Sequence, residues 1–232
     1  MRGPRLKVGV LEDEHDEIDL GLMLASAGHD VSWIHHTEEA RDFQLVVLSV
    51  IEEDLPDLVE ELAAGARRGQ IYLHTCLGHG VQVLDPLEPS GALVVAAHPL
   101  SDKLWAVGSL DELGETVVEL LIGELGGEAL NIPETQRSRL AAGMSYVGFL
   151  ETIRNDAFIL LSEALGNEEK ALGITGELGQ GRILHGVGSV ERELAAIADP
   201  GRARTYRDLT RRTAEISGVQ DIELWAIQED KS

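Results

Sequence analysis

The chain has 232 residues, a formal net charge of −22 at pH 7 and a sequence pI near 4.6. This acidity argues against nucleic acid and anionic membranes as partners, because both would repel the protein. Its 44% hydrophobic and 26% charged residues are ordinary for a soluble globular protein with one large or two small domains. The single cysteine, Cys76, cannot form an intrachain disulfide, so we expect a reducing, cytoplasmic location.

The first half of the chain alternates apolar runs of strand length with helical patterns. Strands are expected at Leu6–Leu11, Val31–Ile34, Leu45–Val50, Gln70–His74, Ala92–His98, Trp105–Val107 and Ala129–Ile132. Helices are expected at Ile18–Ala27, Leu55–Ala66 and Leu110–Gly123, whereas residues 37–44 leave room only for a shortened helix. Continuous apolar runs such as Leu45–Leu48 are typical of strands buried on both faces. The pattern predicts an α/β fold with a doubly wound, mostly parallel sheet.

A domain boundary is expected near Pro133, which gives domains of residues 1–133 and 134–232. Beyond it, only the last few residues have a strand-like pattern. A long amphipathic run at Ser138–Leu165 precedes shorter helical patterns at Lys170–Gly186, Ser189–Ala198 and Ala203–Ser217. The second domain is therefore predicted to be smaller and all-α.

The most informative segment directly follows the first strand. Six acidic side chains occupy eight positions there: Glu12, Asp13, Glu14, Asp16, Glu17 and Asp19. The spacing between the first two strands is that of a strand-turn-helix-strand unit that binds dinucleotides. In that unit a G-x-G-x-x-G turn would occupy positions 12, 14 and 17. All three positions are glutamate in this chain.

Glutamate cannot replace the glycines of such a turn. The glycines allow the tight turn, the close approach of backbone to the pyrophosphate and the packing of helix on strand. Two like charges about 6 Å apart also repel by roughly 3 kcal/mol at an effective dielectric near 20. Several such repulsions are enough to offset most of a micromolar affinity, which is about 8 kcal/mol. Two interpretations stay open: the acids cap the N-terminus of the next helix, or they form an unusual cation or ligand site.

Four stretches of the chain resemble a known family. They are FQLVVLSVIEEDLPDLVEEL (43–62), IYLHTCLGHGVQVLDPL (71–87), GALVVAAHPL (91–100) and DPGRARTYRDLTRRTAEISG (199–218). Residues 6–131 are similar to the N-terminal domain of the Rossmann-like dehydrogenase group, which includes 6-phosphogluconate dehydrogenase and pyrroline-5-carboxylate reductase. A bacterial subfamily of this group adds a helical domain of unknown function. The resemblance implies a Rossmann-like sheet, an NAD(P) cofactor, oxidoreductase activity and a homodimer formed through the helical domain.

The chain departs from the family pattern outside the first turn as well. A Val-Pro-Asp-like segment of the family is replaced by Val50-Ile51-Glu52, and a His-Thr-Ser-Gly segment by His74-Thr75-Cys76-Leu77. A Thr-Gly-Pro-x-x-Arg-Gly-Asp segment is replaced over residues 175–182. These changes affect both domains, so the resemblance does not by itself imply hydride transfer.

Candidate cleft residues follow the predicted strands at the carboxyl edge of the sheet, where open α/β folds bind ligands. They are Ser49, Val50, His74, Thr75, Cys76, His98 and Pro99. His74 and His98 are interpreted either as groups that orient a substrate carboxylate or carbonyl, or as histidines that cap strand ends. Cys76 is favoured as a small buried thiol, because nothing in the sequence indicates an activated nucleophile. No catalytic residue is assigned.

Three further groups carry weaker predictions. His35 and His36 follow the second strand, where an acid would bind an adenosine ribose, and this weakens dinucleotide binding further. A metal site built from histidines and the acidic turn has no recognised ligand spacing, so no metal is assigned. Arginines at 204, 207 and 211 form either an anion patch or, with Asp208, a solvated salt-bridged face, which is favoured.

Three functions follow from these observations. The favoured one is a degenerate dehydrogenase homologue that binds a small molecule in its cleft, with no cofactor bound in the usual mode. The alternative is an active NAD(P)-dependent oxidoreductase with a remodelled turn. The third is a metal-dependent enzyme that uses the acidic turn and the cleft histidines.

Overall fold

The computed structural model describes residues 5–13, 18–179, 184 and 186–229. The chain divides into two compact units, residues 1–138 and residues 139–232. Within the described residues, no helix is long and apolar enough to cross a membrane.

In the first unit, the described residues form one seven-stranded sheet in the order β2-β1-β3-β4-β5-β6-β7. The strands are β1 (Lys7–Glu12), β2 (Asp30–Trp33), β3 (Leu45–Ser49), β4 (Ile71–His74), β5 (Leu93–Pro99), β6 (Leu104–Ser109) and β7 (Glu128–Asn131). All neighbouring pairs are parallel except β5 and β6, which are antiparallel. The predicted strands and the doubly wound, mostly parallel α/β fold are therefore confirmed.

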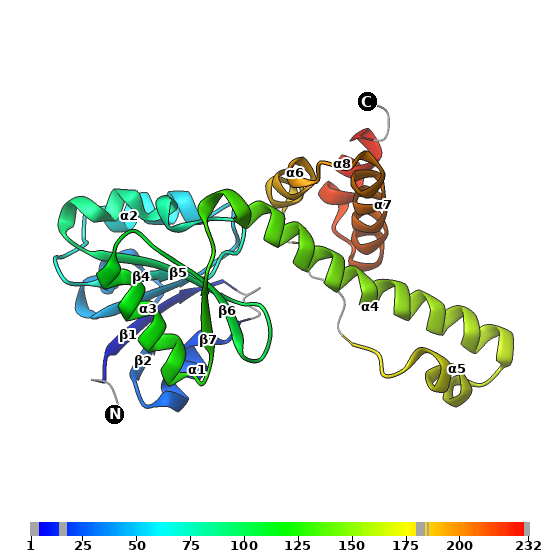
Figure 1. The fold of residues 1–232 in the computed structure, drawn as a ribbon, viewed down its shortest axis with the longest axis horizontal. Helices are drawn as coiled ribbons and strands as arrows, with labels where there is room; N and C mark the ends of the chain where they lie inside the picture. The colour runs from blue at the N-terminus through cyan, green and yellow to red at the C-terminus, as the bar shows by residue number, and fades with distance from the viewer. Residues whose placement is uncertain (1–4, 14–17, 180–183, 185, 230–232) are drawn as a thin grey trace. The chain divides into compact units, whose positions relative to one another are not determined.

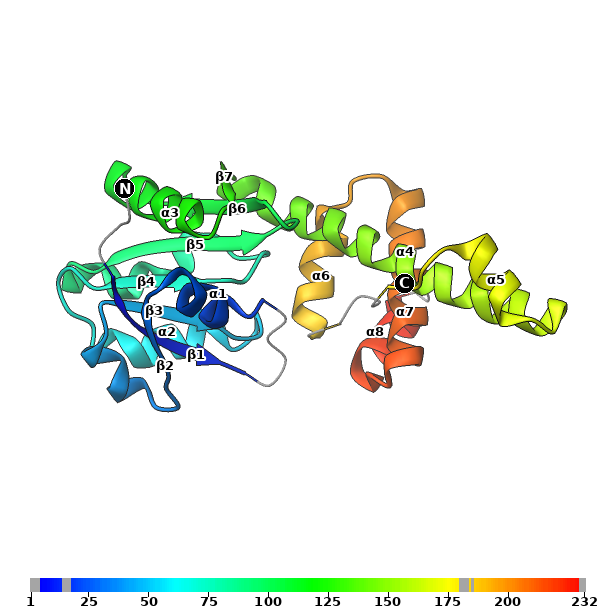
Figure 2. The same ribbon diagram turned by 90° about the horizontal axis from the view of Figure 1, so that it is seen from below.

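Helices cover both faces of this sheet and enclose two apolar cores (Figures 1 and 2). On one face lie α1 (Leu20–Ala27) and α3 (Glu112–Glu124), packed on Val10, Val47 and Val107. The opposite face carries α2 (Leu55–Ala63) and two 3₁₀ segments, η1 (Thr37–Asp42) and η2 (Val81–Ser90). Strand β3 is buried along its whole length because helices cover it on both sides.

Irregular helical segments account for the main local differences from the predicted pattern. The shortened helix between β2 and β3 is η1, whose first turn is capped by a reciprocal pair of bonds between His36 and Glu39. Segment η2 was not predicted, because Pro86 and Pro89 interrupt any helical period within it. The segment ends at Gly91, whose φ of 78° favours glycine.

The second unit is all-α in its described residues. Its helices are α4 (Arg137–Leu165, which begins in the first unit), α5 (Glu168–Thr175), α6 (Val187–Ala196), α7 (Pro200–Ser217) and α8 (Gln220–Glu229). Phe149 of α4 and Tyr206 of α7 meet edge to face in its core, with ring centroids 5.5 Å apart. The strand-like pattern expected in the last residues is wrong, because residues 220–229 form α8 and bury Ile222 and Trp225.

Two glycines of the first unit should respond in opposite directions to substitution by alanine. A Cβ at Gly9 in β1 would lie 2.8 Å from the Phe43 ring, so Gly9→Ala should destabilise the protein by about 1–3 kcal/mol. A Cβ at Gly123 in α3 would meet no described atom within 4 Å, so Gly123→Ala should stabilise it by about 0.5–1 kcal/mol. Urea unfolding midpoints measure both changes, and shifts of the same sign would contradict the packing described for β1.

Candidate functional site

The carboxyl ends of four parallel strands bring the predicted cleft residues to one edge of the sheet. Glu12 at the end of β1 pairs in register with Ser49 at the end of β3, and His74 ends β4 beside Leu48. Strand β5 ends at Pro99, which pairs with Trp105 of the antiparallel neighbour. This is the edge at which open α/β sheets bind their ligands.

Short hydrogen bonds connect most of these residues. The hydroxyls of Ser49 and Thr75 are 3.0 Å apart, and His98 Nδ1 donates to the Thr75 carbonyl oxygen at 2.7 Å. The Cys76 thiol donates to the Val50 carbonyl oxygen at 3.2 Å. The structure therefore brings Ser49, Val50, Thr75, Cys76 and His98 together, and His74 directly precedes Thr75.

His74 is completely buried and neutral. Its Nε2 lies 3.1 Å from the Gly80 carbonyl oxygen, which can only accept, so Nε2 carries the hydrogen and Nδ1 is an acceptor. Burial, and secondarily the nearby Arg137 guanidinium, lower the pKa of His74 from 6.5 to about 3. A group with this pKa cannot serve as a general base near neutral pH. Its Nδ1 atom has no hydrogen-bond partner among the described residues.

Cys76 is the buried thiol that the sequence favours. It is 6% exposed, and its hydrogen bond to a carbonyl oxygen requires the protonated form. It therefore has the environment of a packing residue rather than of an activated nucleophile.

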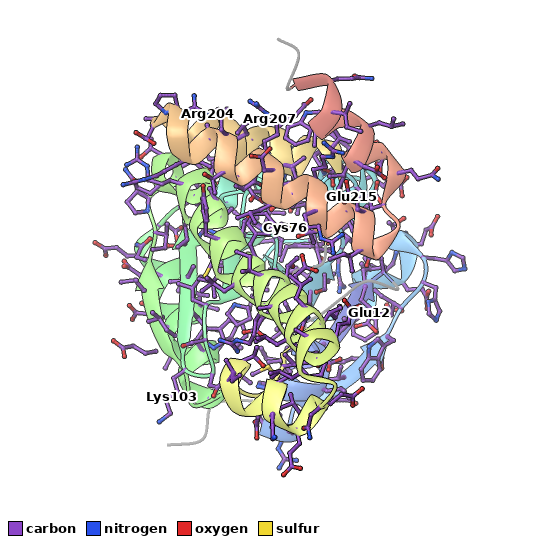
Figure 3. The ribbon with its side chains drawn as sticks, turned by 90° about the vertical axis from the view of Figure 1, so that its right-hand side faces the viewer. Glu12, Cys76, Lys103, Arg204, Arg207 and Glu215 are labelled. Atoms are coloured by element: carbon purple, nitrogen blue, oxygen red, sulfur yellow. The ribbon has the colours of Figure 1, made fainter. Side chains whose placement is uncertain are left out.

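The acidic run is described only at its two ends. Glu12 is exposed at the end of β1 (Figure 3). Asp13 is anchored: its backbone N–H donates to the Ser49 carbonyl oxygen, and its carboxylate accepts from the Ile51 N–H at 2.6 Å. Glu14 and Glu17 lie outside the described residues. Asp13 thus connects the end of β1 to the loop after β3.

The predicted capping of the first helix by these acids is wrong where the structure describes it. Helix α1 begins at Leu20 and has no acid in its first turn. Asp19 occupies the N-cap position with a left-handed φ of 41°, and its side chain makes no capping hydrogen bond. A residue in that conformation cannot direct its carboxylate at the helix amides in the usual way, because an N-cap normally has an extended backbone.

Several residues of this edge were not found from the sequence. The Glu52 carboxylate accepts from the Gly78 N–H at 2.7 Å, and the Glu134 carboxylate accepts from the Gly80 N–H at 3.1 Å. A Cβ at either glycine would collide with these carboxylates. The two glycines were the available signal, because each marks a close approach of another group to the backbone. Arg137 is also buried near this edge. Its only trace in the sequence is Gly108, against which its guanidinium lies.

The histidines after β2 and the residues considered as metal ligands do not belong to this hydrogen-bonded group. The backbone N–H groups of His35 and His36 both donate to Glu39 Oε1, at 3.2 and 3.1 Å. Both side chains are exposed. Among the residues that the structure describes, no three His, Cys, Asp or Glu side chains are placed to hold a metal ion.

Two arginines of α7, Arg211 and Arg212, form salt bridges, and Arg204, Arg207 and Glu215 lie along the same helix (Figure 3). Arg212 donates to both carboxylate oxygens of Asp156, at 2.8 and 2.6 Å, and Arg211 donates to Glu215 at 3.1 Å. The Arg212 hydrogen bonds hold the pKa of Asp156 below its ordinary value. The favoured interpretation of a salt-bridged face therefore holds for Arg211, and also for Arg212, but their partners are Glu215 and Asp156 rather than Asp208.

Comparison with known families assigns both parts of the chain. The description "6-phosphogluconate dehydrogenase C-terminal domain-like" matches residues 133–229, and "Rossmann-like domain" matches residues 30–99. Residues 30–99 are thus similar to a Rossmann-like domain, and residues 133–229 are similar to the C-terminal domain of 6-phosphogluconate dehydrogenase. No curated protein sequence gives a significant match.

Solved structures show the same fold over nearly the whole chain. The NADP-bound pyrroline carboxylate reductase of Plasmodium falciparum has a TM-score of 0.57 and 14% identity, covering 96% of each chain. A pyrroline-5-carboxylate reductase from Coxiella burnetii has a TM-score of 0.55 and 14% identity, covering 97% of this chain and 94% of that one. Prephenate dehydrogenase from Aquifex aeolicus has a TM-score of 0.53 and 11% identity, with coverages of 97% and 90%. At these identities the similarity establishes the fold.

The buried His74 should make the stability of the Rossmann-like domain depend on pH. Its folded pKa is depressed, so the unfolded state takes up a proton first, and stability is lost as pH falls from 6.5 toward about 3. Between pH 6.5 and 5 this loss is about 2 kcal/mol. Urea unfolding of wild type and His74→Gln at pH 7 and pH 5 should therefore show a smaller pH effect in the variant. His35→Gln, which alters an exposed histidine, should behave as wild type; an unchanged pH effect in His74→Gln would contradict the buried neutral state.

Proposed function

We propose that this chain is a dehydrogenase-family protein that binds a small molecule but does not bind NAD(P) in the usual mode. The observation that carries the proposal is the anchored carboxylate of Asp13, together with Glu12, directly after β1. In a Rossmann-like fold this is the start of the turn whose backbone approaches the cofactor pyrophosphate. Here its first residues present negative charge instead of glycine backbone.

The contacts of Asp13 support this proposal more strongly than charge alone. The Ile51 N–H holds the Asp13 carboxylate at 2.6 Å, so moving it away from an incoming phosphate breaks a charge-assisted hydrogen bond. The backbone bond from Asp13 to Ser49 fixes the start of the turn as well. Repulsion between the carboxylate and a diphosphate is therefore not relieved by a simple side-chain rotation.

The position after β2 gives independent support. The ribose of a dinucleotide is bound there by an acid, or its 2′-phosphate by an arginine. In this chain His35 and His36 occupy the position, and the backbone amides there are already hydrogen-bonded to Glu39. The residues present do not fit the cofactor at either of its usual contact points.

The alternative is an active NAD(P)-dependent oxidoreductase with a remodelled turn. It is favoured by the hydrogen-bonded group of Ser49, Thr75 and His98 at the ligand-binding edge, and by the NADP in the structurally similar Plasmodium reductase. It requires that the carboxylates be protonated, turn away or bind the cofactor through a divalent cation.

We also propose that the protein forms a homodimer through α4. Phe149 and Thr152 of this helix face the core of the second unit, where Thr152 lies 3.3 Å from Thr213. Val147, Leu150 and Ile153 are about half exposed on other sides of the same helix. A helix that is apolar on more than one side requires a second partner to bury the rest of its apolar surface.

A cytoplasmic location is part of the same proposal. The buried Cys76 supports it. A chain with a single cysteine cannot form the intrachain disulfides that are typical of proteins in oxidising compartments.

Calorimetric titration with NAD⁺, NADH, NADP⁺ and NADPH tests the cofactor proposal. For each of them we expect either no binding or a dissociation constant above about 10 μM. Values below that limit are ordinary for an enzyme and its ligand. Replacing Glu12, Glu14 and Glu17 together by glycine should create binding or tighten it at least about tenfold, because it supplies the glycine backbone of the usual turn and removes three of the six negative charges, although Asp13 remains.

The matched control replaces the same three residues by glutamine. This variant removes the charge but not the side chains, so it separates repulsion from the need for glycine backbone. Micromolar binding by wild type, with little change in either variant, would instead support the active oxidoreductase.

Light scattering at several protein concentrations tests the dimer. Wild type should have twice the mass of the chain, and the double variant Leu150→Glu with Ile153→Glu should have the mass of one chain, because charge cannot be buried in an apolar contact. Glu163→Gln, an exposed change on the same helix, should remain dimeric. A monomeric wild type at all concentrations would refute the proposal.

A further inference from the structure

In the first unit, His74 and Arg137 are buried polar side chains with atoms that have no hydrogen-bond partner among the described residues, and they lie over residues that are paired side by side in neighbouring strands. We propose that they form the binding site of a small carboxylate, with the Arg137 guanidinium as its anchor and His74 Nδ1 accepting from a hydroxyl on the adjacent carbon. This inference names a ligand class for the small-molecule binding proposed above, and it rests on that proposal only for the existence of a ligand.

Arg137 is the stronger of the two observations. It is 1% exposed, and both terminal nitrogens, Nη1 and Nη2, have no hydrogen-bond partner among the described residues. Burial lowers the pKa of Arg137, and only the charge of Glu134 opposes this effect. The Glu134 carboxylate itself is bonded to the Gly80 N–H. Buried guanidinium donors without acceptors are strongly unfavourable, so a protein retains them where a ligand supplies the acceptors.

The register of the sheet places the two groups in the same row. Ala96 of β5 pairs with His74 of β4 on one side and with Gly108 of β6 on the other. Arg137 Nη2 lies 2.7 Å from the position that a Cβ of Gly108 would occupy, and the Ala96 Cβ lies 3.9 Å from the same position. The guanidinium thus covers Gly108, with only the methyl group of Ala96 between it and His74 in that row. Paired residues of neighbouring strands point to the same face, so His74 and the guanidinium share that face.

The hydrogen-bonding chemistry of the two groups selects the ligand. A guanidinium presents parallel N–H donors that match the two oxygens of a carboxylate. His74 Nδ1 is an acceptor because Nε2 donates to Gly80, so it requires a donor from the ligand. A single arginine in a chain of net charge −22 suits one negative charge better than two. A hydroxycarboxylate such as glycolate satisfies both groups, whereas acetate satisfies only Arg137 and phosphate carries excess charge.

Glycolate, acetate and inorganic phosphate, at constant ionic strength and without dinucleotide, are the probes for this site. Thermal unfolding and calorimetric titration should show saturable binding of glycolate to the dimeric or monomeric full chain, with acetate weaker by at least about tenfold, or 1.4 kcal/mol. Arg137→Met should lose glycolate binding, and Arg41→Met, which changes an exposed arginine of the same domain, should retain it. Because no dinucleotide is present, failure here is separate from failure of the cofactor proposal.

Stability in the absence of any probe distinguishes a binding role from a structural one. Arg137→Met should unfold at a temperature equal to or above that of wild type, because it removes an unpaired buried charge. Gly108→Ala keeps the charge but places a Cβ against Nη2, so it should weaken glycolate binding several-fold while the protein still folds. Absence of saturable wild-type stabilisation by glycolate up to about 50 mM would overturn the proposal. So would equal glycolate binding by Arg137→Met, or a marked loss of stability in that variant without any gain from glycolate in wild type.

Discussion

The hydrogen bond between the Asp13 carboxylate and the Ile51 N–H is the contact on which the functional account depends. It fixes a negative charge at the end of β1 and ties that strand to the loop after β3. In a Rossmann-like fold these two strands flank the point where a dinucleotide crosses the sheet edge. The fold is shared with NAD(P)-binding proteins, yet the first residues at its usual phosphate contact, Glu12 and Asp13, are acidic, and Asp13 is anchored by hydrogen bonds. The fold by itself therefore does not establish which ligand the site binds.

Most of the fold could be predicted from the sequence because the central strands β1, β3, β4, β5 and β6 are largely buried on both faces. The run Leu45–Leu48 is apolar without alternation, and in a chain with helical patterns between such runs this indicates a strand buried on both faces. Prediction failed where the sequence follows neither the helical period nor the strand period. Segment η2 contains two prolines, and residues 221–224 alternate polar and apolar as a strand would, yet they belong to α8, which buries Ile222 and Trp225.

The candidate site was only partly predictable, for a topological reason. Ser49, Thr75 and His98 follow strands, and the carboxyl ends of parallel strands must meet at one edge. Glu134 and Arg137 come from a segment that follows the last strand of the sheet, and no local pattern places it against Gly80 and Gly108. Glycines were the only trace of these contacts in the sequence. The conformation of Asp19 was likewise unpredictable, since an acid before a helix normally indicates a cap.

The acidic edge and the buried arginine describe one consistent chemistry at the carboxyl end of the sheet. In the two proposals, negative charge opposes a diphosphate at β1, and the terminal nitrogens of Arg137, which have no hydrogen-bond partner among the described residues, bind a small anion near β6. Together the proposals describe a protein that keeps the ligand-binding edge of its fold but changes what the edge selects.

Hydrogen exchange of the full chain in the presence of millimolar NADPH tests this account most directly, because it locates any binding. The account predicts unchanged exchange in peptides that cover residues 8–24, whatever happens elsewhere in the chain. Clear protection of those residues, with the first turn of α1 included, would show a dinucleotide bound at the usual place and would contradict it.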